Sequence, residues 1–254
     1  MRRPLAVIEL LSPIFCGDWA SYGEGVQLAP ECPPGAIVLA DLVQRPAVLR
    51  AILERRAAML RCEDLRPVAS AWVMRYLALL LPPVMAAATV LRRVFPLAVD
   101  RVSISLDEEG NVRVFHLPHL GDVRPDAGAP LRYGSLMDDH LAPLFAAIVH
   151  GTRLPQKILW SNAARRLATL FDEAIPRLDE PAVAAVDRAW LLETPCWGAS
   201  RANPMYASPD NTVLKAQGGD KVHRDCCLNY RLPGEGYCGA CPLDQTRGAW
   251  VQWG

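Results

Sequence analysis

The chain has 254 residues, which suits one large domain or one domain with a small appendage. Half of the residues (51%) are apolar, so a sizeable core can be buried. Lys plus Arg and Asp plus Glu each number 27, giving a formal net charge of zero. This balance excludes the basic excess typical of nucleic-acid-binding proteins, so we expect no nucleic-acid partner.

The N-terminal residues 1–40 show no strong periodicity, and we expect loops with short elements there. Pro4, Glu9 and Pro13 interrupt the apolar residues of this region, and no small-residue cleavage site follows. A secretory signal peptide would need an uninterrupted apolar run and a cleavage site of this kind. We therefore expect a cytoplasmic protein.

The next segments are helical in pattern. Residues 46–61 place apolar and charged side chains on opposite faces, which predicts an amphipathic helix. Val68 to Leu91 is apolar enough to suggest a membrane span, but Arg75 lies inside it and Pro82-Pro83 divide it. A central Arg costs about 2.5–3.5 kcal/mol in lipid, and Pro ends or kinks a helix. We therefore expect two buried helices, 68–80 and 83–95. A peripheral contact with the inner membrane, on its cytoplasmic face, is the alternative.

The middle of the chain reads as a hairpin followed by helices. Residues 101–117 alternate apolar and polar side chains around a turn at 107–111, which predicts two antiparallel strands. The Pro- and Gly-rich residues 118–134 predict a loop. Three further helices are expected, at 138–150, 157–174 and 180–192. Together these elements predict an α+β fold that is mostly helical, with a short antiparallel β-sheet and a C-terminal cysteine-rich loop.

The eight cysteines divide into two groups. Cys16, Cys32, Cys62 and Cys196 are scattered, and we expect them to be inert. The other four, which we call the cysteine quartet, are Cys226, Cys227, Cys238 and Cys241, spaced Cys-Cys-x10-Cys-x2-Cys. Cytosolic thiols stay reduced, so clustered cysteines indicate metal ligands before disulfides.

The spacing of the cysteine quartet favours an iron–sulfur cluster. Cys238 and Cys241 can chelate one ion from a tight turn. Adjacent cysteines such as Cys226 and Cys227 fit poorly to zinc sites, which normally use two separated pairs. We infer that Cys238 and Cys241 hold one iron and that Cys226 and Cys227 hold the other. Zinc, disulfides and free thiols remain alternatives.

The sequence around the cysteine quartet resembles the bacterial ferric-siderophore reductase family (FhuF-like). Arg224 precedes the first pair, and Leu228-Asn229-Tyr230-Arg231-Leu232-Pro233 follows it. Leu159-Trp160-Ser161-Asn162-Ala163-Ala164 is similar to the Leu-Trp-x-Asn motif of that family, and Asn203-Pro204-Met205-Tyr206 to its Asn-Pro-aromatic stretch. The resemblance implies a [2Fe–2S] cluster held by all four cysteines. It also implies cytoplasmic reduction of an imported Fe(III)–siderophore, often a hydroxamate, in the course of iron acquisition.

Other site residues are expected beside the cysteine quartet, although none is expected to be catalytic beyond the cluster. The resemblance makes Trp160 and Asn162 candidates for the substrate pocket, with Asn162 bonding to the ligand or to the cysteine loop. Arg165 could face an anionic or carbonyl-rich ligand, and Arg224 and Arg231 could favour the extra negative charge of a reduced cluster. No dinucleotide fingerprint or Walker motif occurs, so we expect electrons from a ferredoxin or a flavoprotein reductase.

These patterns predict two parts, a substrate-binding domain at 1–220 and a cluster-binding segment at 221–254 packed on it. The leading interpretation is a ferric-siderophore reductase that transfers single electrons and releases Fe(II). One alternative is an iron–sulfur electron shuttle or sensor without a siderophore pocket. A zinc-stabilised binding module is the other.

Overall fold

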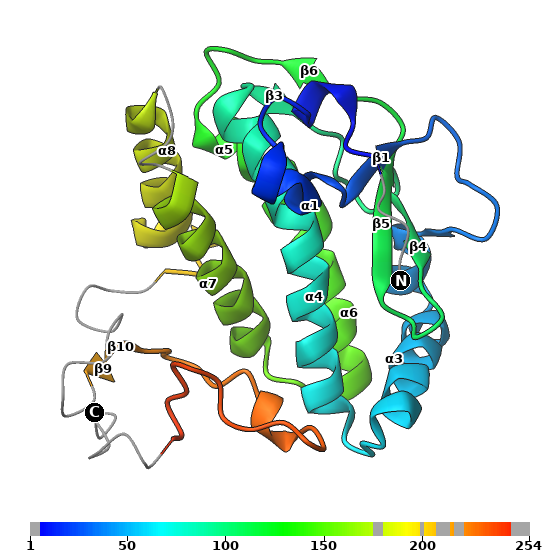
Figure 1. Ribbon diagram of the computed structural model, residues 1–254. Coiled ribbons are helices and arrows are strands. Elements are labelled where there is room, and N and C mark those ends of the chain that lie inside the picture. Colours follow the sequence, from blue (N-terminus) through cyan, green and yellow to red (C-terminus); the bar gives the residue numbers. More distant parts are fainter. Residues whose placement is uncertain (1–5, 175–179, 199–200, 207–213, 216–220, 245–254) are drawn as a thin grey trace.

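The computed structural model describes residues 6–174, 180–198, 201–206, 214–215 and 221–244. Its long helices lie side by side around α4 (Leu65–Met85), with α3 (Pro46–Leu60), α6 (Ala142–Thr152) and α7 (Gln156–Ala174) packed against it. The sheet lies beside α3 and α4, and the cysteine-bearing residues run below the lower ends of α4 and α7 (Figure 1). The α+β prediction is confirmed.

The predicted helices at 46–61, 138–150, 157–174 and 180–192 are confirmed in outline. The last of them is α8 (Pro181–Arg188), which continues as a π-helical segment, Ala189–Glu193. A second π-helical segment, Ser135–Leu141, leads into α6. The shorter helices are α1 (Ala20–Gly23), α2 (Leu39–Gln44) and α5 (Ala129–Gly134). Because α5 occupies part of 118–134, the loop predicted there is wrong in its second half.

The prediction of two helices that meet at the prolines is wrong, because α4 runs through Pro82 and Pro83 without a break. A proline lacks an N–H group, so Pro83 leaves the carbonyl of Leu79 without its usual helical donor. Gly25 packs against that carbonyl so closely that an added Cβ would lie 2.1 Å from the Leu79 oxygen. The helix then continues as a π-helical segment, Ala86–Val90. Residues 80–89 are all buried, and this packing holds the helix together where the local sequence favours a break.

The same helix contains the apolar segment whose length would suit a membrane span. Leu65–Val90 is long and apolar enough to cross a bilayer, with a mean hydropathy of 1.6, but 72% of the apolar window is buried inside the protein. Trp72, Tyr76 and Leu80 are among the fully buried side chains. The apolar composition is accounted for by packing, as in the central helix of any large core.

The predicted hairpin is confirmed by β4 (Ser103–Leu106) and β5 (Val112–Leu117), which pair antiparallel. Two short strands extend it, β2 (Ile37–Val38) beside β4 and β1 (Val26–Leu28) beside β5, giving the order β1-β5-β4-β2. The pairing of β1 with β5 is parallel, so the sheet is mixed and not purely antiparallel. The parallel strand, β1, lies within residues 1–40, where the sequence shows no strong periodicity.

Three two-stranded ladders complete the described strands. They are β3 (Arg93–Val94) with β6 (Asp122–Val123), β7 (Cys196–Trp197) with β8 (Arg201–Ala202), and β9 (Leu214–Lys215) with β10 (Lys221–Val222).

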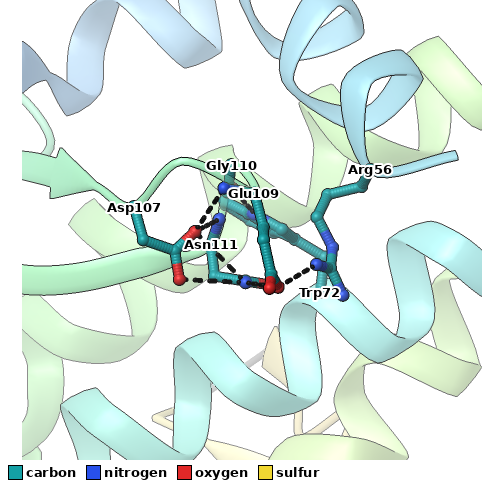
Figure 2. Close-up of polar contacts among 6 residues, drawn as sticks. All are labelled: Arg56, Trp72, Asp107, Glu109, Gly110 and Asn111. Atoms are coloured by element: carbon teal, nitrogen blue, oxygen red, sulfur yellow. Dashed lines mark hydrogen bonds and ion pairs between the residues drawn. The ribbon is translucent and has the colours of Figure 1, made fainter. Parts of the chain in front are cut away.

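The tip of the β4–β5 hairpin is fastened to α3 and α4. Figure 2 shows the residues involved, which are Arg56, Trp72, Asp107, Glu109, Gly110 and Asn111. The Asp107 carboxylate accepts the backbone N–H groups of Glu109 and Asn111, which closes the turn. Trp72 Nε1 donates to the Gly110 carbonyl at 2.9 Å, and Arg56 Nη1 pairs with Glu109 at 2.8 Å. These bonds fix the sheet against the helices.

Candidate metal centre

The cysteine-bearing residues 221–244 are held by ion pairs at the N-terminal ends of two helices. Asp64, the N-cap residue of α4, pairs with Arg231 at 3.0 Å while its side chain also accepts the N–H of Arg66. Lys157, in the first turn of α7, pairs with Asp225 at 3.1 Å. Asp225 is buried, so this contact is shielded from solvent more than an exposed pair would be. The two pairs place the cysteine quartet below the starts of α4 and α7 (Figure 1).

Apolar and backbone contacts complete this attachment. Leu232 is buried against Ala57 of α3, Val68 of α4 and Cys62 in the turn between these helices. Within the cysteine-bearing residues, the N–H of His223 donates to the Ala240 carbonyl at 2.8 Å. This bond brings the two halves of the segment together, so that cysteines from both halves meet.

The four thiols of the cysteine quartet are close together and none forms a disulfide. Cys227 and Cys241 are buried, whereas Cys226 and Cys238 are half-buried. Cys226 interacts electrostatically with Cys241 and Cys227, and Cys238 with Cys227 and Cys241. Among the described residues, no group of three or more His, Cys, Asp or Glu side chains is arranged to hold a single metal ion.

Backbone amides donate to the sulfur atoms. The N–H of Leu228 lies 3.3 Å from Cys226 Sγ, and that of Leu243 lies 3.4 Å from Cys241 Sγ. The N–H of Ala240 also bonds to Cys238. Each of these donors follows its cysteine by two residues. Amides in this arrangement stabilise negative charge on sulfur.

The donor set fits an iron–sulfur cluster. Burial, the largest cause, together with the neighbouring Cys241 and Cys227 raises the pKa of the Cys226 thiol to about 11. Burial likewise raises the pKa of Cys238. The Cys226 and Cys238 thiols therefore resist ionisation by themselves, and bound cations reverse that preference because thiolates are their ligands. Soft thiolates with amide donors are what iron–sulfur clusters use.

The two candidate pocket residues of the Leu-Trp-x-Asn motif lie inside the protein. Trp160 packs edge-on against Phe145, with ring centroids 4.9 Å apart, and against Trp197 at 6.0 Å. Asn162 is buried on α7 and donates through Nδ2 to Ser70 Oγ of α4 at 3.1 Å. A role for either residue in binding substrate stays a prediction.

The three candidate arginines all lie near the cysteine-bearing residues. Arg165 donates to Asn162 Oδ1, and its charge acts with burial, the larger cause, to lower the pKa of His223 to about 4. Arg224 contacts Asp225 at 3.2 Å. Arg231 pairs with Asp64, so in both cases an acid offsets the positive charge. Their effect on a reduced cluster stays a prediction.

Sequence reasoning missed Ser70. Its hydroxyl is fully buried and donates to the backbone carbonyl of Cys227 at 2.7 Å. The serine lies 157 positions before Cys227 in an apolar helix, and no spacing rule connects them. A buried polar residue in that apolar run was the one signal that could have drawn attention to it.

The fold and the site define an α+β protein with a cysteine-ligated metal segment at the end of a helical body. Residues 70–218 match the family model described as "Ferric iron reductase FhuF-like transporter", and residues 224–243 match the "FhuF 2Fe-2S C-terminal domain". The chain belongs to this FhuF-like family. It is a reductase, and its cofactor is a [2Fe–2S] cluster.

Individual relatives agree with this assignment. A "Ferric siderophore reductase" of Escherichia coli (strain K12) is 26% identical over 228 residues, which cover 87% of this chain and 84% of the relative. The fold is also similar to that of the aerobactin synthetase IucA of Klebsiella pneumoniae. The ATP-bound structure has a TM-score of 0.53 at 16% identity, and the match covers 68% of this chain and 37% of the synthetase. A second structure of the synthetase gives 0.52. At this identity the likeness shows the fold alone.

Proposed function

We propose that the protein reduces Fe(III) held by a siderophore, and that the [2Fe–2S] cluster which supplies the electron is bound by Cys226, Cys227, Cys238 and Cys241. The observation that carries the proposal is the meeting of these four thiols, with three amide donors, at the end of the helical body. The family match and the E. coli relative support the reaction.

The burial of the thiols suits an exchange of electrons with outside partners. When bound, the cluster supplies single electrons at low potential. Cys227 and Cys241 are buried and shield one side from water, whereas the half-buried Cys226 and Cys238 leave a path to the surface. Electron entry and exit both need such an exposed edge. The amide of Leu228 stabilises the negative charge of Cys226 at this edge, and the amide of Leu243 stabilises that of the buried Cys241.

The substrate class follows from the chemistry of iron release. Siderophores bind Fe(III) through hard oxygen donors, and Fe(II) is held much less tightly by such groups. Fe(III) takes up one electron, leaves as Fe(II), and a donor protein of the ferredoxin or flavoprotein reductase class replaces that electron. We propose a hydroxamate siderophore as substrate and the cytoplasm as the compartment, with peripheral contact at the inner membrane as the alternative location.

The test is release of Fe(II) from a ferric hydroxamate. The holoprotein is purified without oxygen, reduced chemically, freed of excess reductant and mixed with the ferric siderophore in the presence of a ferrous chelator. We expect reoxidation of the protein and one Fe(II) per electron delivered, because each step moves one electron. A reduced protein that is not reoxidised and yields no Fe(II) with any hydroxamate tried would contradict the proposed function.

A further inference from the structure

A line of buried hydrogen bonds runs from α7 through α4 to the sulfur of Cys226. Ser70 Oγ donates to the carbonyl of Cys227 at 2.7 Å, and the N–H of Leu228 lies 3.3 Å from Cys226 Sγ. That carbonyl and that N–H belong to one peptide group. Ser70 therefore holds the same peptide plane that donates to the sulfur of a proposed cluster ligand.

The direction of each bond in this line is fixed by chemistry. A carbonyl oxygen only accepts, so Ser70 must give its hydroxyl proton to Cys227. Ser70 Oγ is then left to accept from Asn162 Nδ2, at 3.1 Å. The guanidinium of Arg165 only donates, so the atom of Asn162 that it contacts must be Oδ1. All the donors therefore point the same way, from Arg165 toward Cys226.

The surroundings make these bonds strong. Ser70, Asn162 and Cys227 are 0%, 4% and 3% exposed, and in such a low-dielectric interior successive hydrogen bonds polarise one another. Leu228 adopts φ 64°, in the left-handed region that a leucine rarely occupies. An anchor on the preceding carbonyl helps to hold it there. A peptide group polarised at its oxygen is also a better donor at its nitrogen.

We propose that Ser70 and Asn162 are positioning residues that raise the reduction potential of the [2Fe–2S] cluster by orienting and polarising the Cys227–Leu228 peptide group. Reduction adds negative charge to the cluster, and a stronger N–H bond to a ligand sulfur stabilises that charge. The inference rests on the proposed function in one respect, since Cys226 must be a ligand. It adds that the helical body, through α4 and α7, tunes the metal centre to which it is attached.

The test compares reduction potentials of purified holoproteins by EPR-monitored redox titration. Ser70→Ala removes the donor to Cys227 and should make reduction about tenfold less favourable, which is about 59 mV for one electron. Ser70→Thr keeps the hydroxyl and should stay near the wild-type potential. Ser161→Ala, the neighbour of Asn162 on α7, is the matched control and should leave the potential unchanged.

A second variant tests whether Asn162 changes the reduction potential through Ser70 or independently of it. Asn162→Leu keeps the size of the side chain, removes the donor to Ser70 and should shift the potential in the same direction by less. Because Asn162 acts through Ser70, the double variant should shift no further than Ser70→Ala alone. Iron content is measured first. Loss of the cluster would count against the proposed ligands, whereas an unchanged potential in a loaded protein would count against the roles of Ser70 and Asn162.

Two results would overturn the inference. One is a fully loaded Ser70→Ala protein whose reduction equilibrium lies within twofold of the wild type. The other is a double variant whose shift is the sum of the two single shifts. If Ser70→Ala does not fold, a loaded Asn162→Leu protein with an unchanged potential would overturn the inference instead. A purely structural role for these residues would lower thermal stability without moving the potential.

Discussion

His140 shows how one buried side chain links the stability of this protein to pH. Its Nδ1 lies 2.6 Å from the Leu97 carbonyl, which can only accept, so Nδ1 carries the proton. Its Nε2 then accepts from the hydroxyl of Tyr76 at 2.5 Å. Burial lowers the pKa of His140 to about 4, below its ordinary value of 6.5. The folded protein therefore holds this ring neutral.

The sign of the pH effect follows from these pKa values. Between pH 6.5 and about 4 the unfolded chain binds the extra proton at His140 and the folded protein does not. Stability is therefore complete above pH 6.5 and falls as the pH falls through this window, by up to about 3 kcal/mol. Urea unfolding of His140→Gln at several pH values should show a flatter dependence than the wild type. Equal slopes would contradict this account.

Individual residues also show what the sequence can and cannot predict about the site. The cysteine quartet could be predicted because its members lie within sixteen residues and their spacing is itself the signal. Ser70 could not, because its contact with Cys227 depends on how the cysteine-bearing residues pack against α4 in space. The donors at Leu228 and Leu243 were missed for a related reason, since backbone direction is set by the fold of the loop.

At the scale of elements, predictions succeeded where the pattern is local. The β4–β5 hairpin follows from alternating side chains around Gly110, and α3, α6 and α7 follow from helical periodicity. The prediction of a helix break at Pro82 and Pro83 was wrong, because tertiary packing prevails over the local effect of proline. The parallel pairing of β1 with β5 was missed because it joins segments that are distant in the sequence. In addition, the three residues of β1 are too few to show the alternation that predicts a strand.

The close contact between Gly25 and α4 gives a prediction at this scale. An added Cβ at Gly25 would lie 2.1 Å from the Leu79 oxygen and 2.9 Å from Leu79 Cγ. Gly25→Ala should therefore lower the free energy of unfolding by about 1–3 kcal/mol, the usual cost of overpacking. Gly151→Ala is the control, since a Cβ there meets nothing within 4 Å, and it should be neutral or stabilise by up to about 1 kcal/mol. Equal stabilities of the two variants in urea unfolding would contradict the contact.

For the molecule as a whole, the metal centre is attached to a helical body that has its own apolar core. The main apolar core joins the helices and the sheet, whereas Leu232 of the cysteine-bearing residues packs with Ala57, Cys62 and Val68 in a separate small cluster. The division into 1–220 and 221–254 stays a prediction, and residues 245–254 lie outside the described part of the chain. If it is correct, loss of the cluster leaves the helical body folded.

The most direct test of the central claim is the iron content and EPR spectrum of single cysteine variants prepared without oxygen. Cys227→Ser and Cys241→Ser remove buried members of the cysteine quartet and should abolish the [2Fe–2S] signal while leaving the helical circular dichroism unchanged. Cys32→Ser, at an exposed cysteine outside the quartet, should bind two irons per chain and keep the wild-type spectrum. Retention of a normal cluster in either quartet variant, or zinc in place of iron in the wild type, would contradict the account.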